Sequence, residues 1–342
     1  MTEIWCRKEG RAGRITLQRP KALNALTEGM LRAIEAAIDD WAKDDDVALV
    51  MIDAEGERAF AAGGDIVDLY NTGRAGDFAF GQRFWAFEYR LNAKIHEYPK
   101  PFVAFMHGFV MGGGVGVSAL GSHRIATDGT LVAMPEAGIG LVPDVGGSKI
   151  LADAPGRCGE YLGSTAARMG PADAIYAGFC DVYVPGDHLV ALKAKLVETG
   201  DADDIVSFSA TPEPGELEAR QDEIDALFSG GSARQIEHAL EKADSEFAAK
   251  ALKAYRKNCP LSVACFIQMA HDARNLTMTQ ALAREYRFVY RCMEHGEFLE
   301  GIRAAVIDKD RNPQWAKPTL GEVSDEDIAF MLAPPPGGDL TF

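Results

Sequence analysis

Two uninterrupted apolar runs, residues 47–52 and 102–106, constrain the fold of this chain more than any other feature. A run of five or six apolar residues bounded by loops is typical of a strand that is buried on both faces, as in a parallel sheet. Each run is followed by a glycine-containing loop, at residues 60–65 and 108–116, and a helical pattern separates the two units. The chain is therefore predicted to be an α/β protein in which strand, loop and helix recur.

Neighbouring segments fit the same scheme. Alternation at 14–17 predicts a strand, and a helix follows for which Thr27 is the expected N-cap. A further helix is expected at 78–97, and short strands at 124–126, 131–133 and 182–184. The apolar stripe of the first helix consists of Met30, Leu31, Ile34, Ile38 and Trp41.

The length of 342 residues suits one large domain with an appendage, or two domains. Residues 201–218 turn polar, and Pro212 and Pro214 there cannot continue a helix. Beyond them the composition favours helices. We expect a spiral core at 1–200, a helical region at 216–332, and a disordered tail at 333–342.

Charge and composition exclude several functions. A net charge of −16 opposes nucleic-acid binding, which requires a basic surface. No apolar run is long enough to span a membrane, and the first residues lack a signal-peptide pattern, so a cytoplasmic location is expected. Six scattered cysteines and the absence of paired histidine motifs predict neither a metal site nor a redox site.

Glycine loops after apolar strands bring main-chain N–H groups close to a ligand. The N–H groups of Gly64 and Gly113 are candidates for an oxyanion hole, which stabilises the tetrahedral intermediate of acyl transfer. The alternative is that these glycines only permit tight packing of strand and helix. The run 112–116 does not fit a dinucleotide-binding motif, and no Walker A lysine follows it.

Two acids, Glu136 and Asp144, lie in loops among apolar residues. A buried carboxylate without a partner is costly, so each must be paired, cap a helix or be functional. Asp144, before Gly146 and Gly147, also fits a helix cap. If both carboxyls face one cavity, one pKa rises, which suits proton transfer near neutral pH. No nucleophile elbow supports serine catalysis.

These residues resemble motifs of the crotonase (enoyl-CoA hydratase/isomerase) superfamily, in particular its 3-hydroxyisobutyryl-CoA hydrolase branch. The resemblance extends over nearly the whole chain. It rests on Ala22-Leu23-Asn24-Ala25-Leu26, on 60–66, 107–116 and 134–147, and C-terminally on 259–262, 285–287 and 300–310.

The resemblance implies a ββα superhelix that binds an acyl-CoA thioester, with Gly64 and Gly113 as the oxyanion hole. Glu136 falls at a catalytic glutamate of the superfamily, Asp144 at the acid that the hydrolase branch adds, and Glu88 at a substrate-contacting glutamate. Loops implied to bind coenzyme A contain Ala22, Leu23, Asn24, Ala61, Ala62, Asp65 and Ile66.

Hydratases of this superfamily place a first glutamate where this chain has Gly116. Hydration uses two glutamates, whereas thioester hydrolysis releases a thiolate of pKa about 8.5 and needs less acid assistance. We therefore expect hydrolysis of 3-hydroxyisobutyryl-CoA, with coenzyme A as part of the substrate and no other cofactor. An enoyl-CoA hydratase or isomerase and a catalytically silent CoA-binding protein are the alternatives. The superfamily also implies a homo-oligomer, a trimer or hexamer.

Overall fold

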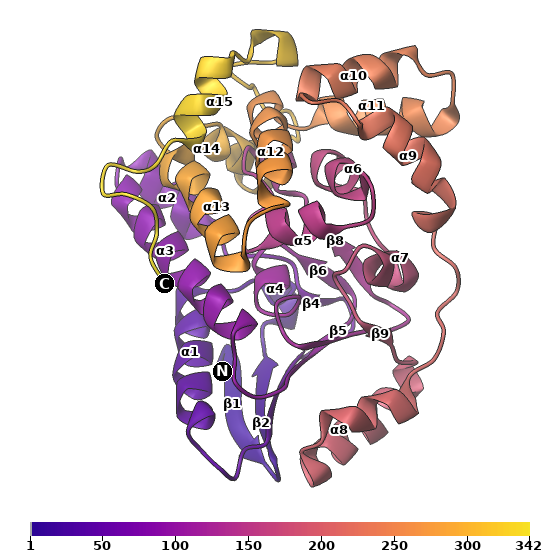
Figure 1. Ribbon diagram of the computed structural model, residues 1–342. Helices are drawn as coiled ribbons and strands as arrows, with labels where there is room; N and C mark the ends of the chain where they lie inside the picture. Colours follow the sequence, from indigo (N-terminus) through magenta and orange to yellow (C-terminus); the bar gives the residue numbers. More distant parts are fainter. Residues whose placement is uncertain (1) are drawn as a thin grey trace. The chain divides into compact units, whose positions relative to one another are not determined.

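The computed structural model describes residues 2–342, and its strands form two sheets (Figure 1). The six-stranded sheet has the order β1-β2-β3-β5-β7-β9, in which only the β1–β2 pair is antiparallel. The three-stranded sheet β4-β6-β8 is parallel. The strands are β1 Ile4–Glu9, β2 Ala12–Leu17, β3 Leu49–Ala54, β4 Ala59–Ala61, β5 Phe102–Met106, β6 Phe109–Met111, β7 His123–Ala126, β8 Leu131–Ala133 and β9 Val182–Tyr183.

From β3 onward, consecutive strands alternate between the two sheets. β3, β5 and β7 pair in the larger sheet, and the strand after each of them pairs in the smaller one. Helices lie between successive pairs, so the repeating unit is two strands followed by helix. This is the ββα spiral that the resemblance implied.

Fifteen α-helices are found in the described residues. They are α1 Glu28–Ala42, α2 Val67–Arg74, α3 Phe78–His96, α4 Gly113–Gly116, α5 Gly147–Asp153, α6 Cys158–Thr165, α7 Pro171–Tyr176, α8 Leu189–Thr199, α9 Gln221–Phe228, α10 Ala233–Lys242, α11 Glu246–Lys257, α12 Pro260–Ala273, α13 Met278–Cys292, α14 Phe298–Ile302 and α15 Asp325–Leu332. Residues 2–342 contain no helix that is both long and apolar enough to cross a lipid bilayer.

Sequence patterns located six of the nine strands found in residues 2–342 and two of the helices, α1 and α3, and indicated helices in the C-terminal part without placing them one by one. The Thr27 side chain caps α1 by accepting a hydrogen bond from Met30 N, and all five predicted stripe residues of α1 are buried. β5 has the predicted bounds, and α3 ends one residue earlier than expected. No pattern in the sequence indicated β1, β4 or β6. β4 and β6 have only three residues each, too few to show a periodic pattern.

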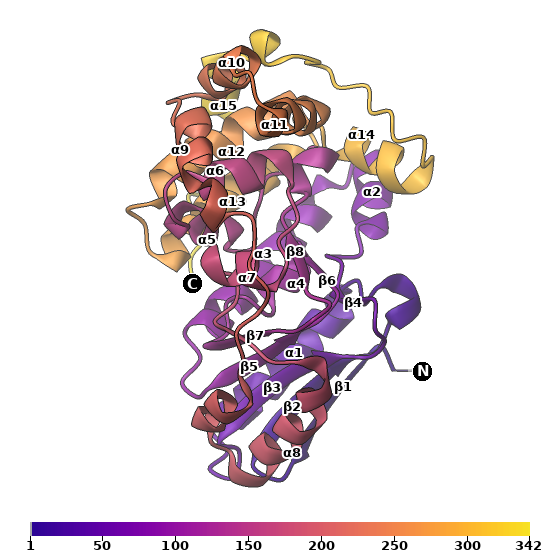
Figure 2. The same ribbon diagram turned by 90° about the vertical axis from the view of Figure 1, so that its right-hand side faces the viewer.

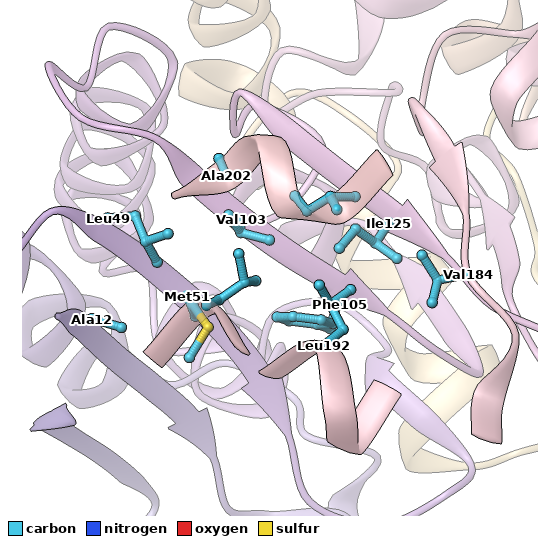
Figure 3. Close-up of a cluster of buried hydrophobic side chains, with 11 residues drawn as sticks. Ala12, Leu49, Met51, Val103, Phe105, Ile125, Val184, Leu192 and Ala202 are labelled. Carbon is cyan, nitrogen blue, oxygen red and sulfur yellow. The ribbon is translucent and has the colours of Figure 1, made fainter. Parts of the chain in front are cut away.

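One hydrophobic core lies between the six-stranded sheet and the segment that contains α8 (Figures 2 and 3). Side chains from the sheet meet those of α8 and of the 3-10 helix Ala202–Phe208. The fully described cluster is Ala12, Leu49, Met51, Val103, Phe105, Ile125, Val184, Leu192, Leu196, Ala202 and Ile205. Residues after position 200, which we expected to lie outside the spiral core, thus complete the core of the sheet.

By its internal contacts the chain divides into two compact units that interleave along the sequence. The first contains Met1–Gly64, Leu91–Ala133 and Arg168–Glu218, and the second contains Asp65–Arg90, Met134–Ala167 and Ala219–Phe342. This is a different division from the predicted consecutive regions at 1–200 and 216–332. Segments return to each unit because the spiral and the later helices pack on parts of the chain far away in sequence.

The last ten residues make specific contacts, whereas we expected residues 333–342 to be disordered. Asp339 forms a salt bridge with Arg287 of α13, at 2.6 Å. Arg291 donates to the carbonyls of Ala333 and Pro334. The proline and glycine content suggested disorder. It did not indicate that Arg287 and Arg291 of α13 bind this segment.

Candidate active site

The two glycine loops predicted to supply the oxyanion hole both lie in the first unit. They follow β4 and β6, which are paired and parallel, so both loops leave the same edge of the small sheet. A Cβ on Gly114 would lie 2.5 Å from the carbonyl oxygen of Ala61, which shows how closely the loops approach. Gly63 and Gly112 have φ values of 111° and 50°, a region that favours glycine.

The proposed donors themselves are free to receive a ligand. Within residues 2–342, neither the Gly64 N–H nor the Gly113 N–H donates to a protein acceptor. Gly113 is the first residue of α4, where N–H groups have no partner within the helix. A Cβ on Gly64 would meet no atom within 4 Å. The loops therefore combine available donors with open space at Gly64.

The predicted coenzyme A loop around Asn24 has a fixed conformation. Leu23 and Asn24 both have left-handed backbones, with φ of 51° and 53°. The buried Asn24 amide donates to the carbonyls of Glu55 and Ala59, and its oxygen accepts from Arg19 N. Because these bonds occupy the side chain, any ligand contact of Asn24 would come from its main chain.

Other predicted binding residues flank this loop. Ala62 N donates to the Leu23 carbonyl, which joins the loop to the end of β4. Ala22 ends the 3-10 helix Pro20–Ala22, and Ala61 is the last residue of β4. Asp65 and Ile66 belong to the second unit, in which Ile66 precedes α2.

Glu136 begins the 3-10 helix η2 Glu136–Ile139 and is buried in the second unit. Its Oε2 atom has no hydrogen-bond partner within the described residues. Two later elements fix η2. Cys259 N, just before α12, donates to the Ala137 carbonyl, and Gly301 of α14 lies so close to the Ile139 carbonyl that a Cβ would be 2.1 Å away. A buried, unpartnered carboxyl oxygen on a fixed support suits a group that acts on a ligand.

Asp144 is also buried, and its Oδ2 accepts a 2.6 Å hydrogen bond from the hydroxyl of Tyr89. Tyr89 is fully buried on α3 beside Glu88. Asp144 contributes to the start of α5 only through its main-chain carbonyl, which accepts a hydrogen bond from Gly147 N. No side-chain cap hydrogen bond is found at the start of α5.

A fourth acid, Glu285 of α13, completes this cluster. Its carboxylate is fully buried and accepts from Gly146 N, Ser148 N and the Ser148 hydroxyl. We define the acid cluster as Glu88, Glu136, Asp144 and Glu285. None of these four carboxyls forms a salt bridge with an arginine, lysine or histidine of residues 2–342.

Burial without a cation raises the pKa of every acid in the cluster. Desolvation and the nearby Asp144 charge raise the pKa of Glu88 to about 8 and that of Glu136 well above its usual value. Burial raises the pKa of Asp144 to about 7, although the Tyr89 hydrogen bond acts in the opposite direction. The pKa of Glu285 rises to about 8, mainly through burial. The cluster can therefore exchange protons near neutral pH.

The structure thus brings the predicted acids together within one unit and the predicted oxyanion glycines together within the other. Sequence reasoning gave no role to Tyr89, Ser148 or Glu285. A signal was present for Glu285, because it falls on the buried stripe of α13 that includes Ala281, Phe288 and Cys292. An acid on such a stripe needs partners in the fold.

A family model described as enoyl-CoA hydratase/isomerase matches residues 12–332. The chain belongs to this family. It is 38% identical over 336 residues to the mitochondrial 3-hydroxyisobutyryl-CoA hydrolase of Danio rerio, covering 95% of this chain and 88% of that protein.

Two crystal structures share the whole fold. One, described as an enoyl-CoA hydratase from Rhodobacter sphaeroides 2.4.1, is 49% identical with a TM-score of 0.94, and the match covers 100% of both chains. The other, described as a carnitinyl-CoA dehydratase from Mycobacterium thermoresistibile, is 37% identical with a TM-score of 0.95, covering 100% of this chain and 99% of that one. These matches confirm the predicted α/β spiral with its C-terminal helical region.

Proposed function

We propose that this chain hydrolyses an acyl-CoA thioester and that 3-hydroxyisobutyryl-CoA is its preferred substrate. The observation that carries the proposal is Gly116, a buried glycine at the end of α4 where the resemblance places the first glutamate of hydratases. Hydration uses two catalytic glutamates, and this chain lacks the first of them at its usual position. Hydrolysis of a thioester does not need that group. The name of the Danio rerio relative supports the same reaction.

In the proposed reaction, Gly64 N–H and Gly113 N–H donate to the thioester carbonyl oxygen, which becomes negative as the carbonyl carbon turns tetrahedral. In one route Glu136 attacks that carbon, the carbon–sulfur bond breaks to leave a mixed anhydride, and water then hydrolyses the anhydride. In the other route Glu136 removes a proton from the attacking water, and the carbon–sulfur bond breaks to leave the free acid. Coenzyme A leaves as a thiolate in both routes, and Asp144 orients the nucleophile or gives its own proton to the sulfur and recovers one from Glu136 or water.

Single turnover in ¹⁸O-labelled water tests for a mixed anhydride that is opened at the Glu136 carbonyl carbon. A mixed anhydride that water attacks at the Glu136 carbonyl carbon leaves one labelled oxygen in that side chain, whereas a general base leaves none. Mass spectrometry of the peptide that contains residue 136 measures the label. Label found only in the product acid would exclude water attack at the Glu136 carbonyl carbon, and is the result expected of a general base or of attack at the acyl carbon of the anhydride.

Glu88 is proposed to recognise the substrate hydroxyl. It is buried, and no hydrogen bond to another described residue occupies its carboxyl. Glu88→Gln should therefore lower kcat/KM for the hydroxyacyl thioester more than for the isobutyryl thioester that lacks the hydroxyl. Equal losses for both thioesters would assign Glu88 another role.

Hydration of an enoyl-CoA is the second candidate, because the relative with 49% identity is described as an enoyl-CoA hydratase. Thiol release from a panel of acyl-CoA thioesters, measured beside the loss of crotonyl-CoA absorbance, distinguishes the two reactions. Thiol release without loss of the enoyl absorbance supports hydrolysis. Coenzyme A binding with neither activity would leave the silent binding protein as the explanation.

The proposal also includes expectations for cofactor use, oligomeric state and cellular location. Carboxylate chemistry with main-chain donors requires no metal, so activity should survive dialysis against EDTA. A trimer or hexamer is expected by light scattering. The cytoplasmic location predicted above lacks support from the Danio rerio relative, whose name says mitochondrial. Cell fractionation would decide it.

A further inference from the structure

The turn that carries Asp144 has an unusual backbone. Val145 and Gly146 are consecutive residues with positive φ values, 53° and 85°. A β-branched residue rarely adopts this region, because its side chain crowds the main chain. Such a conformation persists only where surrounding contacts enforce it.

The strongest of these contacts come from Glu285. One carboxylate oxygen accepts from Gly146 N at 2.8 Å, and the other accepts from Ser148 N at 3.0 Å and from the Ser148 hydroxyl. Glu285 is fully buried on α13, 137 or more positions away in the sequence. A single side chain therefore holds both ends of the segment that follows Asp144.

Tyr89 fixes Asp144 from its other side. Its hydroxyl donates to Asp144 Oδ2 at 2.6 Å, and its ring packs edge-on to Tyr286, the neighbour of Glu285 on α13. The side chain of Asp144 and the main chain after it are thus both held, one by α3 and one by α13.

We propose that Glu285 is a positioning residue for Asp144: it holds the 145–148 turn in its strained conformation and so sets the direction of the Asp144 carboxylate. The inference rests on the proposed role of Asp144 in the reaction. Glu285 itself needs no contact with the substrate, because both of its oxygens are occupied by the turn.

Glu285→Gln tests this role. A glutamine has one oxygen, whereas Gly146 N–H and Ser148 N–H require an acceptor on each side, so the new amide group must face one of these donors. We expect kcat to fall by about 10- to 100-fold, because small displacements of reacting groups slow a reaction by such factors, and KM to stay within about twofold of the wild-type value. Hydrogen exchange at Gly146 and Ser148 should become faster.

Ser148→Ala is the milder companion variant. It removes the hydroxyl bond and leaves both main-chain bonds to Glu285, so it should fold even if Glu285→Gln does not. Its kcat should fall by less than that of Glu285→Gln. Glu294→Gln, an exposed acid just beyond α13, is the matched control and should leave kcat and exchange unchanged.

Combination with Asp144→Asn gives the decisive comparison. If Glu285 acts through Asp144, Glu285→Gln and Ser148→Ala should lower kcat no further in the Asp144→Asn background. A full additional loss there would overturn the proposal, as would faster exchange at 146–148 with unchanged kcat in the single variants.

Failure of the proposed function gives a different result. A wild-type chain that hydrates crotonyl-CoA and releases no thiol would contradict hydrolysis, and the same variants would then be compared on hydration. A wild-type chain with neither activity would overturn the positioning role together with hydrolysis. Exchange at 146–148 would still report whether Glu285 holds the turn.

Discussion

At the scale of single residues, the acid cluster is the source of the carboxyls that we propose to take part in the reaction. Its four carboxyls are buried in one unit and have no cationic partner among residues 2–342. A structural ion pair would lower their pKa values, whereas here burial raises all four. Keeping them in this environment costs stability, which is typical of functional groups rather than of structural ones.

Glu136→Gln should abolish most of the activity. It preserves the volume of the side chain but can neither attack a carbonyl carbon nor remove a proton from water. We expect kcat to fall about 10²- to 10⁴-fold, the usual contribution of a catalytic base. Thiol release measures the effect, and unchanged melting serves as the folding control. Wild-type turnover by this variant would exclude Glu136 from the reaction.

The pH dependence of turnover should follow the raised pKa values of the cluster. In the proposed reaction Glu136 is the base or nucleophile, and burial together with the Asp144 charge raises its pKa well above the usual value, so its carboxyl needs to lose a proton before it can act. We expect kcat to rise at a pH well above the usual carboxyl pKa of about 4. A profile that is already flat from pH 5 upward would show that no group of the cluster titrates in the reaction.

At the scale of elements, the paired strands β4 and β6 bring together two loops that lie about 50 residues apart in the chain. Their glycines differ in what a side chain would meet. Gly114 faces main chain of Ala61, which cannot move away, whereas Gly64 faces open space. The two positions therefore offer a matched pair of substitutions that separate packing from ligand binding.

Gly114→Ala should reduce the free energy of unfolding by about 1 to 3 kcal/mol, because the added methyl overlaps the Ala61 carbonyl. Gly64→Ala should change stability by less than about 0.5 kcal/mol, since no atom lies within 4 Å of the new methyl. If the space at Gly64 receives the thioester, Gly64→Ala also lowers kcat/KM. Urea unfolding and thiol release test both variants, and full activity of Gly64→Ala would argue against an oxyanion donor there.

At the scale of the whole molecule, burial of the acid cluster links folding to pH. The pKa of Asp144 is about 7 in the fold and about 3.9 in an unfolded chain. Its folded value is the higher one, so the unfolded chain releases this proton first. The stability associated with Asp144 is therefore present below pH 4 and is lost as the pH rises from about 4 to 7.

Asp144→Asn removes this dependence. Relative to wild type, the variant should become more stable as the pH increases from 5 to 8, by about 2.5 kcal/mol in the free energy of unfolding. Urea unfolding at the two pH values measures it. An identical difference between variant and wild type at pH 5 and pH 8 would contradict a raised pKa for Asp144.

The sequence alone determined those features that arise from local patterns. The stripe of α1 predicted that helix, because burial of one face leaves a periodic signal, and the apolar run at 102–106 predicted β5, because burial of both faces leaves a continuous run. Glycines after strands located both loops that contain the candidate oxyanion donors. Local composition also marked Glu136 and Asp144, since acids among apolar residues need an explanation.

Only the tertiary structure decided which distant groups meet. Glu285 and Tyr89 come from helices far from residue 144, and no spacing in the chain indicates that both hold the Asp144 segment. The interleaved units and the packing of the 333–342 tail on α13 have the same origin. Hydrogen bonds and buried surface form between residues that are close in space, and their energy depends on distance and solvent exclusion rather than on separation along the chain.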